Sequence, residues 1–223
     1  MRLCREAYER YEFHKVHYLV NQFCSVELSS LYIDITKDRM YCDAPHGARR
    51  RATQSVMYRV FDRLTRLLAP ILVFTADEAW GYFRKENSIH LERFPEPDST
   101  QLNPDAVRDV EALLRARQVV SQALETARQQ KVIGNNLEAK VELSFPADDR
   151  VHHLKLDDIE EFLILSHLDL SVGAGEPTAT ATRTDRQRCE RCWRHRAMVG
   201  AIAEHPTLCD RCAEVVDEMT VRK

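Results

Sequence analysis

The feature that most constrains this chain is a pair of Cys-x-x-Cys motifs near its end. Cys189 and Cys192 form the first motif, Cys209 and Cys212 form the second, and sixteen residues separate the two. This spacing is typical of four thiolates around one tetrahedral Zn²⁺, because each short turn directs two sulfurs at the same ion. A redox dithiol and disulfides are the alternatives. Four thiolates fill the coordination sphere, so we predict a structural zinc ion rather than a catalytic one.

The segment around these cysteines is too small to fold on apolar burial alone. The few dozen residues after Ala181 cannot bury enough apolar surface to offset their conformational entropy, so metal binding is expected to supply most of the folding free energy. His195 and His205 lie between the motifs. Because four sulfurs are already at hand, we interpret these histidines as one surface residue and one packed residue rather than as ligands.

The first zinc motif lies in an arginine-rich stretch. Residues 183–196 include six arginines and two acidic residues, and Trp193 directly follows the second cysteine. Guanidinium groups pair with phosphates and an indole can stack on an unpaired base, so this composition suits a single-stranded RNA loop. A solvated arginine face and a tryptophan packed on a small zinc module explain the same residues. The candidate RNA contacts in this stretch are Trp193, Arg188, Arg191, Arg194 and Arg196.

The composition is that of an ordinary globular protein. The 223 residues are 44% apolar and carry a formal net charge of −3, so nucleic-acid binding would have to come from local basic patches. The longest apolar run, residues 67–74, is interrupted by a proline and is too short to cross a bilayer. The N-terminus lacks the apolar core of a signal peptide, and the cysteine pattern fits a reducing compartment. We therefore expect a cytoplasmic protein without a membrane segment.

The first hundred residues are expected to be helical. Residues 3–41 contain no glycine or proline, and apolar residues recur there at spacings of three and four, which predicts two or three packed helices. Pro45 and Gly47 interrupt this pattern, and a second long helix is predicted to run to about Leu68.

Three arginines on that long helix are further candidates for RNA contact. They can follow a phosphate backbone along one helix face, although a solvated helix face is the favoured interpretation without further context. They are Arg59, Arg63 and Arg66, at steps of four and three.

Two predicted helix starts differ in whether a capping motif precedes them. Thr75 and Glu78 form a Thr-x-x-Glu capping box, which predicts a helix that starts at Thr75. The first helical segment, in contrast, begins at residue 3 without a capping motif. We interpret this as a sign that part of a longer chain precedes it.

A second region follows a break in the sequence. Prolines and polar residues at 95–100 mark this break. Asn103 supplies a capping side chain before Pro104, which suits the first helical position, so a long helix is predicted from there to about Gln130. Residues 139–145 alternate as a half-buried strand does.

The rest of this region predicts a small α+β unit. It is completed by a helix at about 159–165 and a strand at about 169–172, whereas residues 173–185 predict a flexible tether because they are rich in Gly, Ala and Thr. We therefore divide the chain into a helical domain at 1–98, a long helix with a small α+β domain at 99–175, and a tether with a zinc finger at 176–223.

The sequence contains no motif for catalysis. Phosphate-binding loops, dinucleotide-binding turns, the Gly-x-Ser-x-Gly elbow and the His-Glu-x-x-His pair do not occur in it. The acidic pairs Asp157/Asp158 and Glu160/Glu161 are interpreted as solvated charges at helix ends.

Several stretches resemble the C-terminal part of bacterial isoleucyl-tRNA synthetases, which are class I aminoacyl-tRNA synthetases. SSLYIDITKDRMYCD and LLAPILVFTADEAW resemble the helical anticodon-binding domain that the isoleucine, valine, leucine and methionine enzymes share, and SIHLERFPE resembles the segment that closes it. KVIGNNLEAKV and the two Cys-x-Arg-Cys motifs are similar to the isoleucine enzymes in particular. The resemblance implies a mainly α fold, in which a helical bundle precedes a small α+β unit and a C-terminal four-cysteine zinc finger.

The resemblance also implies a function. The bundle and the zinc finger would bind the anticodon stem-loop of isoleucine tRNA, with Trp193 and the nearby arginines as candidate contacts. The ATP-binding motifs of the family lie in an N-terminal catalytic region and do not occur here. We therefore expect a monomer that binds tRNA, depends on that catalytic region as its partner and does not activate isoleucine alone. A stand-alone zinc-containing protein-interaction or general RNA-binding module, and an incomplete gene product, are the alternatives.

Overall fold

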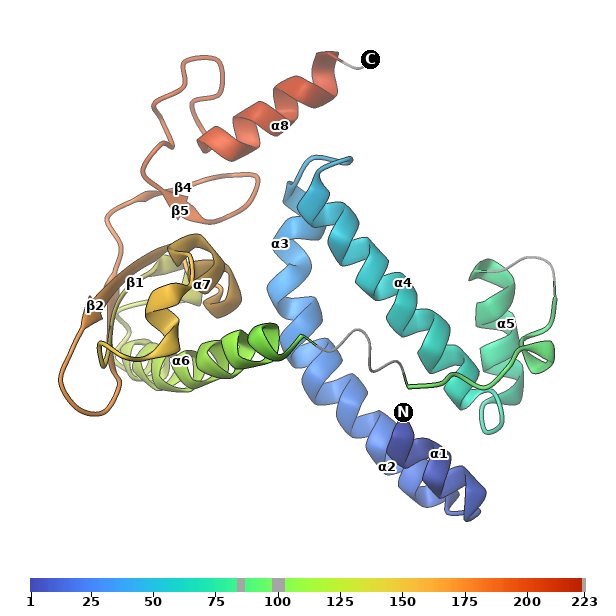
Figure 1. Cartoon of the computed structure of the whole chain (residues 1–223). Coiled ribbons are helices and arrows are strands. Elements are labelled where there is room, and N and C mark those ends of the chain that lie inside the picture. The colour runs from blue at the N-terminus through green and yellow to red at the C-terminus, as the bar shows by residue number, and fades with distance from the viewer. Residues whose placement is uncertain (84–86, 98–102, 222–223) are drawn as a thin grey trace. The chain divides into compact units, whose positions relative to one another are not determined.

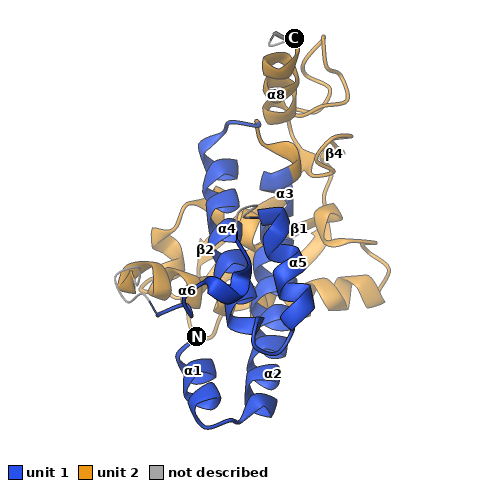
Figure 2. Ribbon diagram, turned by 90° about the vertical axis from the view of Figure 1, so that its right-hand side faces the viewer, with its two compact units in different colours: residues 1–40, 45–101 blue, residues 41–44, 102–223 orange. Residues whose placement is uncertain are grey.

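The computed structural model describes residues 1–83, 87–97 and 103–221. The chain divides into two compact units (Figure 2): residues 1–40 and 45–101 form unit 1, and residues 41–44 and 102–223 form unit 2. The break expected at 95–100 falls partly on residues 98–102, which lie outside the described residues. Among the helices that are described, none combines the length and the apolar character needed to cross a bilayer.

Unit 1 consists of helices, as the periodicity predicts. The helical backbone continues without a break from Phe13 to Cys42 and includes a long π-helical stretch, which the periodicity did not predict. Within that stretch the Ser30 hydroxyl donates to the carbonyl of Ser25, five residues earlier. The elements of this part of the chain (Figure 1) are α1 (Arg2–Glu9), α2 (Phe13–Gln22), the π-helix (Phe23–Ile33), α3 (Asp34–Cys42), α4 (Ala48–Leu68), α5 (Val73–Phe83) and a 3₁₀ turn (Ile89–Leu91).

Two small apolar clusters hold unit 1 together. One cluster packs α1 and α2 against the end of α4, where the Tyr8 hydroxyl also donates to the carbonyl of Leu67 at 2.8 Å. The other cluster surrounds Trp80 on α5 and includes Ile89. Asp77 connects α5 to the 3₁₀ turn, because its carboxylate accepts from the Ser88 hydroxyl and the Ile89 amide; these hydrogen bonds lower its pKa.

The predicted start of α5 at Thr75 is wrong. The helix begins at Val73, and the Ala76 amide already donates to the Leu72 carbonyl at 2.8 Å. The Leu72 amide in turn donates to the Leu68 carbonyl, so helical turns continue almost directly from α4. The capping side chain is therefore not needed, since backbone carbonyls already satisfy these amides.

Unit 2 begins with the predicted long helix. Asn103 accepts from the amides of Asp105 and Ala106, and the helix ends within one residue of the predicted Gln130. The elements of this unit are α6 (Pro104–Gln129), a 3₁₀ turn (Asn136–Glu138), β1 (Ala139–Phe145), a second 3₁₀ turn (Arg150–His153), α7 (Leu156–Leu163), β2 (His167–Val172), β3 (Thr178–Arg183), β4 (Gln187–Arg188), β5 (His195–Arg196) and α8 (Asp210–Val221).

A three-stranded sheet with two helices forms the core of unit 2. The strand order is β2-β1-β3, in which β1 pairs parallel to β2 and antiparallel to β3. The inward side chains of β1 alternate with partly or fully exposed ones, as predicted for residues 139–145. They pack with α6 and α7 in one apolar cluster that includes Val120, Leu143 and Ile159.

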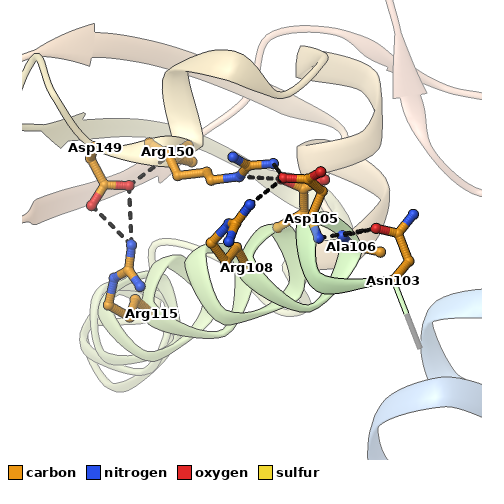
Figure 3. A network of polar contacts seen from close by, with 9 residues as sticks. Asn103, Asp105, Ala106, Arg108, Arg115, Asp149 and Arg150 are labelled. Atoms are coloured by element: carbon orange, nitrogen blue, oxygen red, sulfur yellow. Dashed lines mark hydrogen bonds and ion pairs between the residues drawn. The ribbon is translucent and has the colours of Figure 1, made fainter. Parts of the chain in front are cut away.

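Charged residues fix α6 to the 3₁₀ turn that precedes α7 (Figure 3). Arg150 lies between Asp105 and Asp109 of α6, and Arg115 reaches across to Asp149. Asp149 also caps the turn by accepting from the amide of Val151. These pairs set the direction in which the chain leaves β1 toward α7.

The prediction of a flexible tether at residues 173–185 is wrong, because part of this stretch forms a strand. Thr178–Arg183 forms β3, whose alanines at 179 and 181 face the core while the threonines face outward. Small side chains give a strand little apolar bulk, which is why this Ala/Thr alternation resembled a linker composition. The ladder with β1 satisfies the backbone groups of β3 on that side.

The solvated position predicted for Glu160 and Glu161 is wrong as well. Both are buried, and the Glu160 carboxylate accepts from the Leu168 amide and from Arg196. A buried carboxylate requires such partners. Residues of β2 and β5, which follow later in the chain, supply them.

Candidate metal centre and nucleic-acid surface

Four cysteines converge at the predicted metal centre. Cys189, Cys192, Cys209 and Cys212 are buried, and their sulfurs all lie within 4.8 Å of one another. A tetrahedron with Zn–S bonds of about 2.3 Å has sulfur–sulfur edges of about 3.8 Å. The 3.9 Å between the sulfurs of Cys192 and Cys209 matches such an edge, and it is nearly twice the length of a disulfide bond, about 2.05 Å.

Backbone turns place these sulfurs. In the first motif the Trp193 amide donates to the Cys189 carbonyl, and Trp193 has a left-handed backbone with φ of 64° that closes the turn. The second motif lies at the start of α8, where Cys209 precedes the helix and Cys212 lies in its first turn. The Cys209 amide donates to the sulfur of Cys189 at 3.3 Å, which ties the two motifs together.

The neighbouring thiols of the site favour a thiolate at Cys212, whereas hydrogen bonds with Cys192 and Cys212, together with burial, raise the pKa of Cys209. Hydrogen bonds from Cys192 and Cys209, and then from the Arg191 guanidinium at 3.6 Å, lower the pKa of Cys212 to about 3. The thiolate is the form of cysteine that binds a metal. Four buried sulfurs with tetrahedral spacing leave no open position for a substrate, so the zinc ion of this site is structural.

The two histidines between the motifs are not part of the sulfur cluster. His195 Nδ1 lies 2.7 Å from the carbonyl oxygen of Arg186, and His205 Nε2 lies 2.8 Å from a carboxylate oxygen of Asp217. Both rings are partly buried.

Two candidate RNA contacts of the zinc module face solvent. Trp193 is 64% exposed, although it lies between a zinc ligand and a buried arginine. Arg188 on β4 is exposed as well. An exposed indole is suited to stacking on a base, and an exposed guanidinium is suited to pairing with a phosphate.

The other three arginines of the module are engaged within the protein. Arg194 is only 4% exposed and donates to the Leu165 carbonyl at 2.6 Å. Arg196 pairs with the buried carboxylate of Glu160 at 2.9 Å. Arg191 donates to the Cys42 carbonyl at 2.6 Å. RNA contact by these three stays a prediction, and in this conformation each would first have to leave its partner.

The three candidate arginines of α4 also differ in exposure and in their contacts within the protein. Arg59 is exposed, whereas Arg63 is partly buried and lines a pocket of about 460 Å³ with Cys4 and Leu67. Arg66 pairs with Asp62 on the same helix and also donates to the Arg93 carbonyl. Among these three, Arg59 is therefore the one whose side chain is directed to solvent.

Sequence reasoning missed Arg211, which lies between the cysteines of the second motif. Its guanidinium pairs with Asp43 at 3.3 Å, next to the Cys42 carbonyl that Arg191 contacts. The signal that could have found it was the repetition of Cys-x-Arg-Cys in both motifs.

Known protein families match both parts of the chain. Residues 2–143 match the family described as "Anticodon-binding domain of tRNA ligase". Residues 186–215, which include all four cysteines, match the family described as "Zinc finger found in FPG and IleRS". These matches agree with the resemblance seen in the sequence and with the geometry of the metal centre.

Individual relatives are isoleucine-tRNA ligases. One from Syntrophotalea carbinolica is 38% identical over 226 residues, which cover 96% of this chain and 24% of the relative. One from Methylacidiphilum infernorum is 40% identical over 211 residues, which cover 94% of this chain and 23% of the relative. The chain thus spans about a quarter of the length of these relatives, and it corresponds to their C-terminal part.

Proposed function

Because the chain belongs to the family of anticodon-binding domains of tRNA ligases, we propose that it binds the anticodon stem-loop of a tRNA. The family match over residues 2–143 carries this proposal. The likeness to isoleucine-tRNA ligases makes isoleucine tRNA the proposed ligand. In the parent enzyme this region would orient the tRNA so that its acceptor end reaches a catalytic region that attaches isoleucine with ATP.

The exposed residues of the zinc module support RNA binding. Trp193 offers an indole face on a turn that the zinc ligands fix, so little conformational entropy is lost when a base stacks on it. Arg188 offers a charge for a phosphate nearby in the sequence. Arg59 offers a second charge on α4 of unit 1. Because the chain has a formal net charge of −3, attraction to the RNA phosphates would have to come from such local basic groups.

The zinc ion has a structural role in this function. When bound, it supplies the folding free energy that a segment of this size lacks, and it holds the two motifs together. The residues of the module then position the exposed indole. We propose the cytoplasm as the compartment, since thiols persist there, and a monomer as the working form beside the catalytic region.

The direct test of this proposal is the salt dependence of binding. Fluorescence anisotropy with labelled isoleucine tRNA is expected to show an affinity that falls steeply between about 50 and 200 mM salt. Arg188→Ala and Arg59→Ala should each lower the slope of log K against log salt by about one unit if each arginine contacts a phosphate. Salt-insensitive binding, or equal binding to any RNA, would instead favour a protein-interaction or general RNA-binding module.

A substitution at Trp193 tests whether its indole stacks on a base. Trp193→Asn removes the indole and keeps a residue that tolerates the left-handed backbone, so the zinc turn is retained. Loss of a stacked base is expected to weaken binding by about 1–3 kcal/mol without a change in the salt slope. Zinc content, measured on the same sample, shows whether the turn is intact. Unchanged affinity in a zinc-loaded variant would remove Trp193 from the interface.

A further inference from the structure

The two zinc motifs share an arginine that metal binding does not require. Each motif reads Cys-x-Arg-Cys, with Arg191 in the first and Arg211 in the second. A turn that brings two sulfurs to one ion depends on the cysteines and on the backbone, not on a guanidinium at the third position. The shared arginine therefore points to a second role of the motifs.

Both arginines reach the same segment, Tyr41–Ala44. Arg191 Nη1 lies 2.6 Å from the carbonyl oxygen of Cys42, and the Cys42 sulfur lies 3.8 Å from the carbonyl oxygen of Arg191. Arg211 Nη1 lies 3.3 Å from Oδ1 of Asp43. The two halves of the zinc site thus hold two consecutive residues. The segment belongs to unit 2 with the zinc module, although more than 140 residues separate them in the sequence.

The segment needs these partners. Cys42 is 6% exposed and packs in one cluster with the four zinc ligands and Val199. Cys42 is also the last residue of α3, so its carbonyl oxygen lies beyond the hydrogen bonds within the helix. A cation is favoured at this C-terminal end because the helix dipole is negative there. Asp43 is 9% exposed, and a carboxylate at that depth requires a charged or hydrogen-bonded partner.

Arg191 connects this segment to the metal cage itself. Besides the Cys42 carbonyl it contacts the sulfur of Cys212 at 3.6 Å. Four thiolates around Zn²⁺ carry a net charge of about −2, which a neighbouring guanidinium offsets. The side chain thus bridges the sulfur and the carbonyl, so this contact depends on where the Cys212 sulfur is held.

We propose that Arg191 and Arg211 are positioning residues that clamp Tyr41–Ala44 onto the zinc module, so that zinc binding orders this segment. The segment includes the last two residues of α3 and precedes α4, which begins at Ala48. Zinc binding therefore acts on Tyr41–Ala44 as well as on the residues between the zinc motifs. This inference does not depend on RNA binding, and its test contains no RNA.

Alkylation of Cys42 in the zinc-loaded full chain tests the clamp. N-ethylmaleimide is applied, the modified peptides are quantified by mass spectrometry, and zinc is measured in parallel. Loss of a hydrogen bond to a charged group should make Cys42 react about tenfold faster or more in Arg191→Ala and Arg211→Ala. Arg188→Ala, an exposed arginine of the same module, is the matched control and should leave the rate unchanged.

The Arg211 variants keep the test decisive if Arg191→Ala loses zinc. Arg211 contacts Asp43, so Arg211→Ala tests the clamp on the other motif, and Arg211→Lys, which keeps the charge, should restore part of the protection. Removal of zinc from the unmodified chain should raise both the alkylation of Cys42 and amide hydrogen exchange at residues 41–44. The clamp is refuted if Cys42 stays protected in zinc-loaded Arg211→Ala, or if chelation leaves residues 41–44 unchanged.

Discussion

At the scale of residues, the arginines of the zinc module divide into two groups. Arg188 faces solvent, whereas Arg191, Arg194 and Arg196 hold a carbonyl, a second carbonyl and a buried carboxylate of the same unit. The sequence shows the charge of these residues but not their burial, because burial depends on α7, on Leu165 after it and on the segment 41–44, which lie far away along the chain. For this reason the cluster was predicted but its division was not.

Arg194 provides a prediction about stability. Replacing it with alanine leaves the Leu165 carbonyl without its buried donor, so we expect Arg194→Ala to lower the free energy of unfolding of unit 2 by about 3 kcal/mol. Arg188→Ala should change it by less than about 0.5 kcal/mol, as surface substitutions usually do. Urea denaturation followed by circular dichroism measures both. Equal, small effects would mean that Arg194 is not held in this buried position.

At the scale of elements, local signals predicted most of the fold. The strand at 139–145 has the predicted bounds because its apolar residues alternate, and α6 begins at its predicted cap because Asn103 and Pro104 act locally. The predictions that were wrong concern residues whose partners lie far away along the chain. β3 gains its order from the ladder with β1, and Glu160 is buried by residues of β2 and β5. The π-helix at 23–33 has no local signal that separates it from an α-helix.

The existence of β3 can be tested with a pair of substitutions. Ala181 faces the core opposite Val141, so Ala181→Asp buries a carboxylate without a partner and should destabilise unit 2 by several kcal/mol. Thr182 is exposed and lies opposite Lys140, so Thr182→Asp should be close to neutral. Thermal unfolding compares the two variants. A flexible tether would tolerate both substitutions equally.

At the scale of the whole molecule, one zinc site positions both a candidate RNA contact and the clamp on Tyr41–Ala44. The four cysteines fix the turn that displays Trp193, and their motifs supply the arginines that hold Tyr41–Ala44. The resemblance to isoleucyl-tRNA synthetases, the family match and the sulfur cluster agree on a tRNA-binding region with a structural zinc. This chain spans about a quarter of the length of the isoleucine-tRNA ligases that it matches.

The most direct test of the account is the binding of isoleucine tRNA by the zinc-loaded and the zinc-free chain, measured in parallel at low salt. The account predicts that the loaded chain binds this tRNA more tightly than an unrelated tRNA. Chelation should weaken binding at least about tenfold, because it disorders the surface that carries Trp193. Re-addition of zinc should restore it. Absence of binding by the loaded chain, or equal binding with and without zinc, would contradict the account.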